Sequence, residues 1–356
     1  MLRFLQGHAF AVLVLALILL TSHGDLSLTA IQQAAAPYNY DLVTWEAGHF
    51  MGKWWYKAWD VLPGGHRDRQ RRLASIRQFF DLVAQVNGQA AAVQRVASAP
   101  GHAEGELAAA EARLDELRAR LRAEGARVEE ALESELSDAL GAQGLKSRIG
   151  MVFPPVDFAF DPTPKLLIVS PRERIETRDT ALLRSNMTVE QMEGVEVQIL
   201  RSEDLSALVD DTGGVATYPS VIPPAYDLRT TLQIIAHEWL HQFFFFRPLG
   251  RHYGSSPEMT TLNETAADMA GRELGDLAYE AITGQNPRSE PGAGPPAPPG
   301  VFDFSREMRV TRVHTDELLA QGRMEEAERY MEERRQLFVQ NGYYIRKLNQ
   351  AYFAFH

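Results

Sequence analysis

The stretch TLQIIAHEWLHQFFFF, residues 231–246, places two histidines four residues apart, with a glutamate directly after the first. Positions four apart on an α-helix share one face. His237 and His241 can therefore bring two imidazole nitrogens to one zinc ion, at about 2.0–2.1 Å. Glu238 points about 100° around the helix, which keeps it off the metal but close to a bound water. The spacing predicts a zinc site with Glu238 as general base.

The residues around the two histidines predict a helix that is mostly buried. Asp227 suits the N-cap position, and Pro248 and Gly250 predict that the helix stops at about Phe246. Apolar side chains precede and separate the histidines. A buried histidine without a partner is costly. The alternative to a metal site is therefore a pair of core histidines bonded to each other or to the backbone.

A third ligand is available on a second predicted helix, residues 260–281. The stretch NETAAD (263–268) places Glu264 and Asp268 on one face of it. Glu264 would complete a His₂Glu site and leave the fourth position open to water. Asp268, with Asn263 beside the ligand, would form the surrounding shell, in which the outer N–H of a ligand histidine is accepted.

Small residues and rival carboxylates complete this part of the prediction. Gly271 and Gly275 lie along the same side as Glu264, small enough for the two helices to pack closely. Glu258 and Asp268 are rival third ligands, each less favoured than Glu264.

Together the two stretches resemble the gluzincin (thermolysin-like) zinc metallopeptidases. That family pairs H-E-x-x-H on one helix with N-E-x-x-x-D on the next, and residues 237–241 and 263–268 match both patterns. The resemblance covers roughly residues 212–275. It implies a peptidase with one Zn²⁺ ion held by His237, His241 and Glu264, and it pairs Asp268 with His237. The longer metzincin pattern does not fit.

The resemblance also implies an edge strand and a residue that stabilises the transition state. In the family, an antiparallel edge strand beside the zinc binds the substrate backbone, and GGVATYPSV (213–221) is in the right place for it. The family also has a downstream Tyr or His that stabilises the oxyanion. His314, Tyr343 and Tyr344 are candidates only.

The predicted fold class is α+β and helix-rich, with a zincin-like catalytic core. This core would combine a small mixed sheet, an antiparallel edge strand, the active-site helix and the glutamate helix. Predicted strands cover KLLIVS (165–170), VEVQIL (195–200) and the edge segment 212–224. Helical periodicity over 71–89 and 104–140 predicts a hairpin or short coiled coil.

The chain divides into five predicted segments. A signal peptide or signal anchor (1–24) precedes a helical N-terminal region (25–150) and the catalytic core (151–285). A Pro/Gly-rich linker (286–302) leads to C-terminal helices (303–356) that pack on the core.

The N-terminus and the composition bear on localisation and partners. Arg3 precedes the apolar run Ala9–Leu20, and no Lys or Arg follows until Lys53, which predicts an extracytoplasmic chain that is membrane-anchored by this segment or secreted. A buried N-terminal core helix is the alternative. The net charge of −11 argues against nucleic acid as a partner. Because the chain has no cysteine, any zinc must use His and carboxylate ligands.

The sequence therefore favours an extracytoplasmic zinc metallopeptidase that acts on peptides or proteins. Two alternatives stay open. The first is a non-catalytic, membrane-anchored helical scaffold with a structural or vestigial zinc site. The second is a zinc enzyme that hydrolyses something other than peptides, since the site specifies hydrolysis better than substrate.

Overall fold

The computed structural model describes residues 28–42, 44–45, 69–98, 104–147, 150–287 and 302–356. The predicted signal segment 1–24 lies outside these residues, as does most of the Pro/Gly-rich linker. Among the described helices, none is both long enough and apolar enough to cross a bilayer. The described chain is helix-rich and contains both parallel and antiparallel strand pairs.

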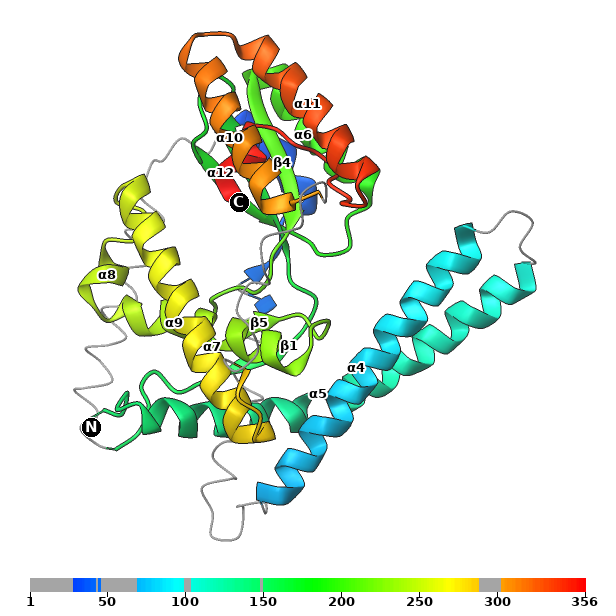
Figure 1. The fold of residues 1–356 in the computed structure, drawn as a ribbon, viewed down its shortest axis with the longest axis vertical. Coiled ribbons are helices and arrows are strands. Elements are labelled where there is room, and N and C mark those ends of the chain that lie inside the picture. Colours follow the sequence, from blue (N-terminus) through cyan, green and yellow to red (C-terminus); the bar gives the residue numbers. More distant parts are fainter. Residues whose placement is uncertain (1–27, 43, 46–68, 99–103, 148–149, 288–301) are drawn as a thin grey trace, which may run out of the picture.

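The predicted N-terminal hairpin consists of α4 (Arg69–Ser98) and α5 (Glu104–Ala142), which pack side by side (Figure 1). Leu114, Leu121 and Val128 of α5, which recur every seven residues, are buried. Glu135 is buried as well, and its carboxylate accepts hydrogen bonds from the guanidinium groups of Arg69 and Arg72. The helix α4 extends beyond its predicted range, 71–89, at both ends, and α5 continues past its predicted end at residue 140.

Two glutamates of α5 bind the backbone of a short strand. β1 (Phe158–Phe160) pairs in parallel with β5 (Ser220–Ile222). On the other side of β1, the N–H of Phe158 donates to Glu133 Oε1 at 3.0 Å, and the N–H of Phe160 donates to Glu129 Oε1 at 2.7 Å. Carboxylates of α5 thus take the place of a further strand.

A second sheet has three antiparallel strands in the order β3-β2-β4. The central strand β2 (Lys165–Pro171) confirms the strand predicted at 165–170. Its neighbours are β3 (Asp179–Leu183) and β4 (Leu205–Asp211). The small amount of sheet is therefore divided between two separate sheets rather than gathered in one.

The strand predicted at VEVQIL (195–200) is wrong, because these residues belong to the helix α6 (Val189–Glu203). Thr188 and Gln191 form a capping box that starts the helix. Val195 and Ile199 are buried one helical turn apart, whereas Val197 is 39% exposed. Two of the three alternating positions thus fit a helix equally well.

Several short elements cover the antiparallel sheet. The helix α2 (Ala30–Ala35), followed by the 3-10 turn η1 (Ala36–Tyr38), packs against α6. The C-terminal helix α12 (Gln350–Phe355) packs on β2 and β4. The buried Glu196 joins α6 to β4 and to the segment before α12, since it accepts hydrogen bonds from the N–H of Val209, from Arg346 and from Lys347.

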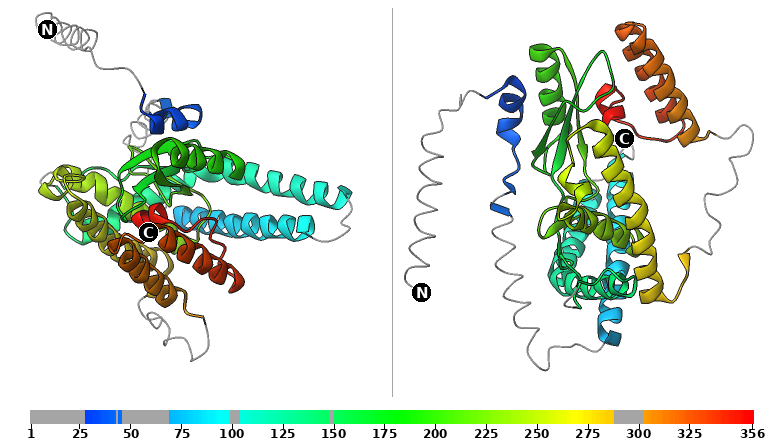
Figure 2. Two further views of the ribbon diagram at one scale, coloured as in Figure 1. Left: turned by 90° about the horizontal axis from the view of Figure 1, so that it is seen from above. Right: turned by 90° about the vertical axis from the view of Figure 1, so that its left-hand side faces the viewer.

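The C-terminal region contains helices, as predicted for residues 303–356. α10 (Phe304–Ala320) and α11 (Met324–Gln340) form a pair beside the antiparallel sheet (Figures 1 and 2). Met331 and Phe338 of α11 are buried against Leu348 and Phe353.

The largest hydrophobic core joins the hairpin to the helices that carry the candidate site. These are α7 (Leu228–Phe245) and α9 (Pro257–Thr283), connected through the short helix α8 (Pro248–Arg251). The predicted glycine contacts are present. A Cβ on Gly271 would lie 3.0 Å from His237 Cα, and one on Gly275 would lie 2.6 Å from Gln233 Cα. Glycine at these positions lets α9 approach the α7 backbone closely.

The substitution Gly275→Ala is expected to destabilise the fold by about 1–3 kcal/mol, because the new methyl group would overlap backbone atoms of α7. Gly194→Ala in α6 is the matched control, because a Cβ there meets no atom within 4 Å. It should instead add up to about 1 kcal/mol through helix propensity. Urea unfolding followed by circular dichroism measures both changes. Equal midpoints for the two variants would contradict close packing at Gly275.

Candidate metal centre

The histidine pair lies on α7, in the helix that the sequence predicts. Asp227 is its N-cap, and the Asp227 carboxylate accepts the N–H of Thr230 at 3.0 Å. The helix is held in the core by Trp239, which is buried and donates its indole N–H to the Pro154 carbonyl at 2.8 Å. The opposite side of the helix carries His237 and His241 towards α9.

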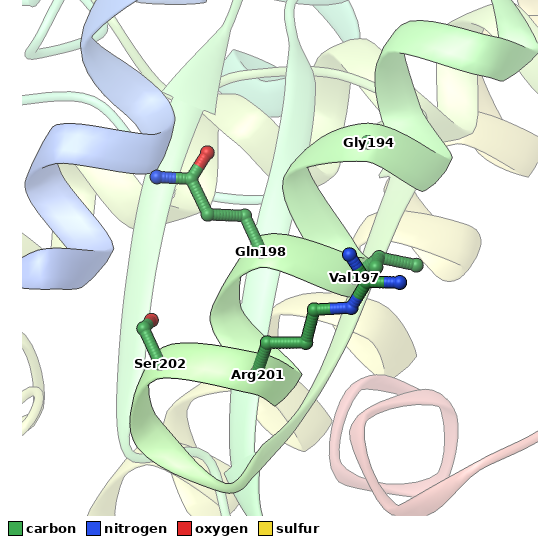
Figure 3. Close-up of a pocket in the computed structure, with 5 residues that line it drawn as sticks. All are labelled: Gly194, Val197, Gln198, Arg201 and Ser202. Atoms are coloured by element: carbon green, nitrogen blue, oxygen red, sulfur yellow. The ribbon is translucent and has the colours of Figure 1, made fainter.

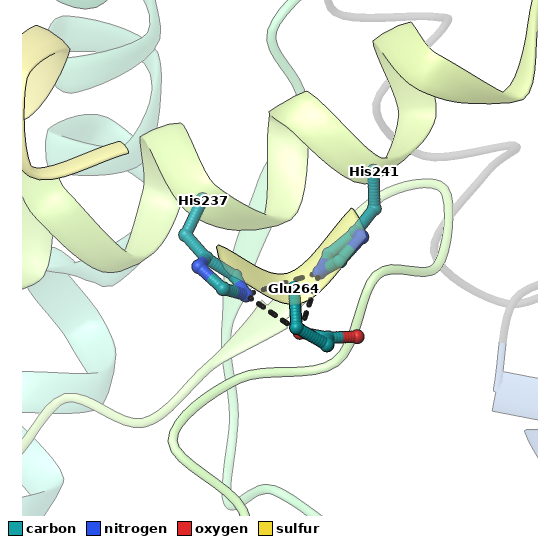
Figure 4. Close-up of side chains that lie close together, drawn as sticks. All are labelled: His237, His241 and Glu264. Atoms are coloured by element: carbon teal, nitrogen blue, oxygen red, sulfur yellow. Dashed lines mark hydrogen bonds and ion pairs between the residues drawn. The ribbon is translucent and has the colours of Figure 1, made fainter. Parts of the chain in front are cut away.

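Three predicted ligand side chains converge on one point between α7 and α9 (Figure 4). The Nε2 atoms of His237 and His241 are 3.0 Å apart. Glu264 Oε2 lies 3.6 Å from His237 Nε2 and 3.4 Å from His241 Nε2. Glu264 therefore faces both imidazoles, whereas its rival Glu258 does not belong to the cluster.

These separations are suited to one small divalent cation. Tetrahedral zinc with ligand bonds of about 2.0–2.1 Å places neighbouring ligand atoms about 3.3 Å apart. The three observed separations, 3.0, 3.4 and 3.6 Å, bracket that value. Within the described part of the chain, this is the one group of three or more His, Asp or Glu side chains close enough to share an ion.

Asn263 contacts the outer nitrogen of a histidine in this cluster. It is buried, and its side-chain oxygen lies 3.0 Å from His241 Nδ1. An amide oxygen in that position favours a proton on Nδ1 and leaves Nε2 free to face the cluster. Asn263, which is predicted to belong to the shell around the ligands, thus contacts His241.

The predicted contact between Asp268 and His237 is wrong, because Asp268 binds a different side chain. The Asp268 carboxylate instead accepts two hydrogen bonds from Arg272, one turn further along α9. Both side chains are exposed in large part. A short Asp side chain with a long Arg four residues away forms this helix-surface pair locally, so its position does not depend on α7.

Glu238 is almost completely buried beside the histidines. A glycine backbone covers it, since a Cβ on Gly214 would lie only 2.5 Å from Glu238 Oε1. Burial raises the pKa of Glu238, and the neighbouring imidazoles oppose that rise. The carboxylate next to the cluster is therefore held away from bulk water and has an increased affinity for a proton.

The charges of His241 and Glu264 are coupled. Burial alone would raise the pKa of Glu264, but its contacts with His237 and His241 hold the pKa far below its usual range. Burial alone would lower the pKa of His241, but the hydrogen bond and charge of Glu264 outweigh it and raise the pKa. The site thus favours a negative carboxylate together with positive charge between the helices.

Tyr253 is a site residue that the sequence analysis missed. Its hydroxyl donates to Glu264 Oε1 at 3.0 Å, and its ring lies 6.2 Å from the His241 ring. Burial and the Glu264 carboxylate raise the pKa of Tyr253 to about 12, so the hydroxyl keeps its proton. It comes from the connection after α8, where no periodic pattern marks it.

The three predicted transition-state stabilisers lie elsewhere. His314 of α10 contacts Glu317 and the Tyr330 ring. Tyr343 packs on Phe302 and Phe304, and Tyr344 is 92% exposed. Since these residues belong to the C-terminal region beside the antiparallel sheet (Figure 1), they are not part of the cluster.

A shallow hollow on the outer face of α6 is separate from the cluster. Its lining is drawn in Figure 3 and consists of Gly194, Val197, Gln198, Arg201 and Ser202. These residues include no carboxylate or histidine, so the hollow offers no metal ligands of the kind found between α7 and α9.

Comparison of the chain with family models, with curated proteins and with solved structures finds no match in any of the three.

Proposed function

We propose that this protein is an extracytoplasmic zinc metallopeptidase of the gluzincin type. The observation that carries the proposal is the convergence of His237, His241 and Glu264 at separations suited to one zinc ion. A buried glutamate, Glu238, directly follows the first ligand in sequence. A His₂Glu set with an open fourth position is the ligand set of catalytic rather than structural zinc.

The three ligands of the cluster and the neighbouring Glu238 and Tyr253 have separate roles in amide hydrolysis. His237, His241 and Glu264 would hold the zinc ion, which would supply Lewis acidity to polarise the scissile carbonyl and to lower the pKa of a water molecule to about 7. Glu238 takes the proton of the attacking water and later passes it to the leaving amine. Its raised pKa suits this exchange. Tyr253 holds one oxygen of Glu264, and the other oxygen then faces the histidines.

The segment before α7 is the proposed binding site for the substrate backbone. Gly214 lies beside Glu238, and Val215 forms an antiparallel bridge with Val221 of β5. A peptide that adds to this segment by backbone hydrogen bonds would place its carbonyl near the cluster. The antiparallel edge strand expected from the resemblance corresponds here to a single bridge next to a parallel pair.

The direct test is hydrolysis of a mixed peptide substrate, such as casein, by the purified full chain loaded with zinc. We expect hydrolysis that 1,10-phenanthroline abolishes and that added zinc restores. Mass spectrometry of the products then shows whether peptide bonds are cleaved. Zinc-loaded chain that leaves all peptides intact, or hydrolysis that the chelator does not affect, would contradict the proposal.

A non-catalytic scaffold is the second candidate, and the long α4–α5 hairpin favours it (Figure 1). A structural zinc site is usually closed by a fourth protein ligand. The described cluster contains three ligands. X-ray absorption spectroscopy of the zinc-loaded chain distinguishes the candidates, because a fourth nitrogen or carboxylate from the protein indicates a scaffold.

Gly214→Ala is expected to lower peptide hydrolysis by about 100-fold, because the new Cβ would displace the Glu238 carboxylate and a 1 Å misplacement can cost that much. Zinc content should not change. Gly88→Ala in α4 is the control, because a Cβ at Gly88 has no atom within 4 Å and Gly88 lies outside the proposed substrate-binding segment. Steady-state kcat/KM and bound zinc are measured for both variants. Equal activity in the two would show that Gly214 does not position the general base.

A further inference from the structure

An exposed apolar surface lies at the C-terminal end of α7. Phe245 is 69% exposed, and its ring contacts that of Phe246 with 5.2 Å between centroids. Phe153, from the connection after α5, also lies 5.2 Å from the Phe246 ring and is 53% exposed. Met151, two residues earlier, is 60% exposed. The three phenylalanine side chains form the aromatic patch, and the exposed Met151 lies close to Phe153 in the chain.

The backbone beneath the aromatic patch is ordered by hydrogen bonds. The N–H of Ser147 donates to the Met151 carbonyl at 2.7 Å, and Lys146 forms an antiparallel bridge with Val152. Phe245 is the last residue of α7. The two parts that carry the patch therefore present large apolar side chains to solvent from fixed positions, and such a surface gains free energy when it is covered.

Two arginines follow Phe245 and Phe246 in the chain. Arg247 and Arg251 are exposed, and no ion pair involves either of them within the described part of the chain. The Arg247 guanidinium lies over the Phe243 ring, 3.7 Å from its centroid. No acidic residue occurs between Glu238 and Glu258. In a chain with a net charge of −11, the stretch between these two glutamates is locally cationic.

We propose that the aromatic patch, with Arg247 and Arg251, docks on an anionic lipid surface. Aromatic rings are favoured at the headgroup level of a bilayer, and exposed arginines bind lipid phosphates while their stems cover apolar surface. A membrane is the occupant that the chain itself indicates, since its apolar run Ala9–Leu20 is predicted to enter one. This proposal does not depend on zinc or on catalysis.

Docking at this surface would set the orientation of the candidate metal centre. His241 and Phe245 are four residues apart on α7, about 6 Å along the helix axis. The metal centre would thus be held close to the headgroup region by a second contact besides the N-terminal segment.

The absence of cysteine makes a labelling experiment direct. The full chain carries a single nitroxide at Phe245→Cys, at Phe153→Cys or at the control Met269→Cys, and is mixed with vesicles of phosphatidylcholine and phosphatidylglycerol. Met269 of α9 is as exposed as Phe245, at 69%. Collision rates with oxygen, which enters the bilayer, and with a nickel chelate, which stays in water, are measured for each label.

We expect the labels at 245 and 153 to collide with oxygen and to be shielded from nickel, while the label at 269 collides with nickel. Vesicles without phosphatidylglycerol, or the changes Arg247→Glu and Arg251→Glu, should increase nickel access at 245 several-fold. Nickel access at 245 and 153 equal to that at 269 would overturn the proposal. Shielding from both reagents would also overturn it, because a protein segment or a second copy would then cover the patch. Indifference to lipid charge would overturn the assignment to anionic lipid.

Discussion

Glu238→Gln is expected to lower peptide hydrolysis by about 10²–10⁴-fold, the usual contribution of a positioned general base. Glutamine fills the space beside Gly214 as glutamate does, but it cannot accept the proton of the attacking water. Zinc should stay bound, since the ligand cluster consists of His237, His241 and Glu264. Steady-state kcat/KM and zinc per chain, measured on the same preparation, separate catalysis from metal binding.

An exposed glutamate away from the histidines, Glu258, provides the control for the Glu238 substitution. Glu258→Gln alters the same kind of side chain, in the first turn of α9 and in an exposed position, and should leave both zinc content and hydrolysis as they are. If Glu238→Gln retains hydrolysis within a few-fold of the unsubstituted chain, Glu238 is not the base, and the proposed division of roles on α7 is wrong.

The second large effect is expected on metal affinity. Glu264→Gln should weaken zinc binding by more than about 100-fold, because even a residue that only orients a ligand typically contributes 10–100-fold. The change removes the negative charge that the two imidazoles stabilise, as the strongly lowered pKa of Glu264 indicates. Competition with a chelator of known affinity measures the change, and hydrolysis should fall with it.

The contrast between Glu264 and Glu258 makes the affinity test specific. Both are glutamates of α9, but only Glu264 faces the histidines. Glu258→Gln should therefore bind zinc as the unsubstituted chain does. Equal affinity of the two variants would show that a different group is the third ligand, and circular dichroism of each variant checks that α9 is retained.

Much of the site could be predicted because its signals are local. His237 and His241 are four residues apart on one helix, and Glu264 lies on a helix with its own glycine stripe at Gly271 and Gly275. Those spacings determine which side chains share a face. How α7 and α9 approach one another follows from residues that are small enough to permit contact.

Other parts were predicted wrongly or missed, for reasons that differ from one residue to the next. The segment at Val195 has a pattern that fits both a strand and a helix, and the capping box at Thr188 and Gln191 determines the helix. Tyr253 reaches Glu264 only through the path of the chain after α8. Asp268 has a local Arg272 partner, so a carboxylate at the family position does not by itself indicate a contact with His237.

Two carboxylates of α5, those of Glu129 and Glu133, cover one edge of β1. An uncovered strand edge presents unpaired N–H and C=O groups, with which another chain can form hydrogen bonds. Because the N–H groups of Phe158 and Phe160 already donate to carboxylates of α5, this edge of β1 offers fewer donors to an incoming strand. Under the proposed function, a substrate backbone would therefore add at the other edge of this two-stranded sheet, where Val215 bridges Val221 and Gly214 lies beside Glu238.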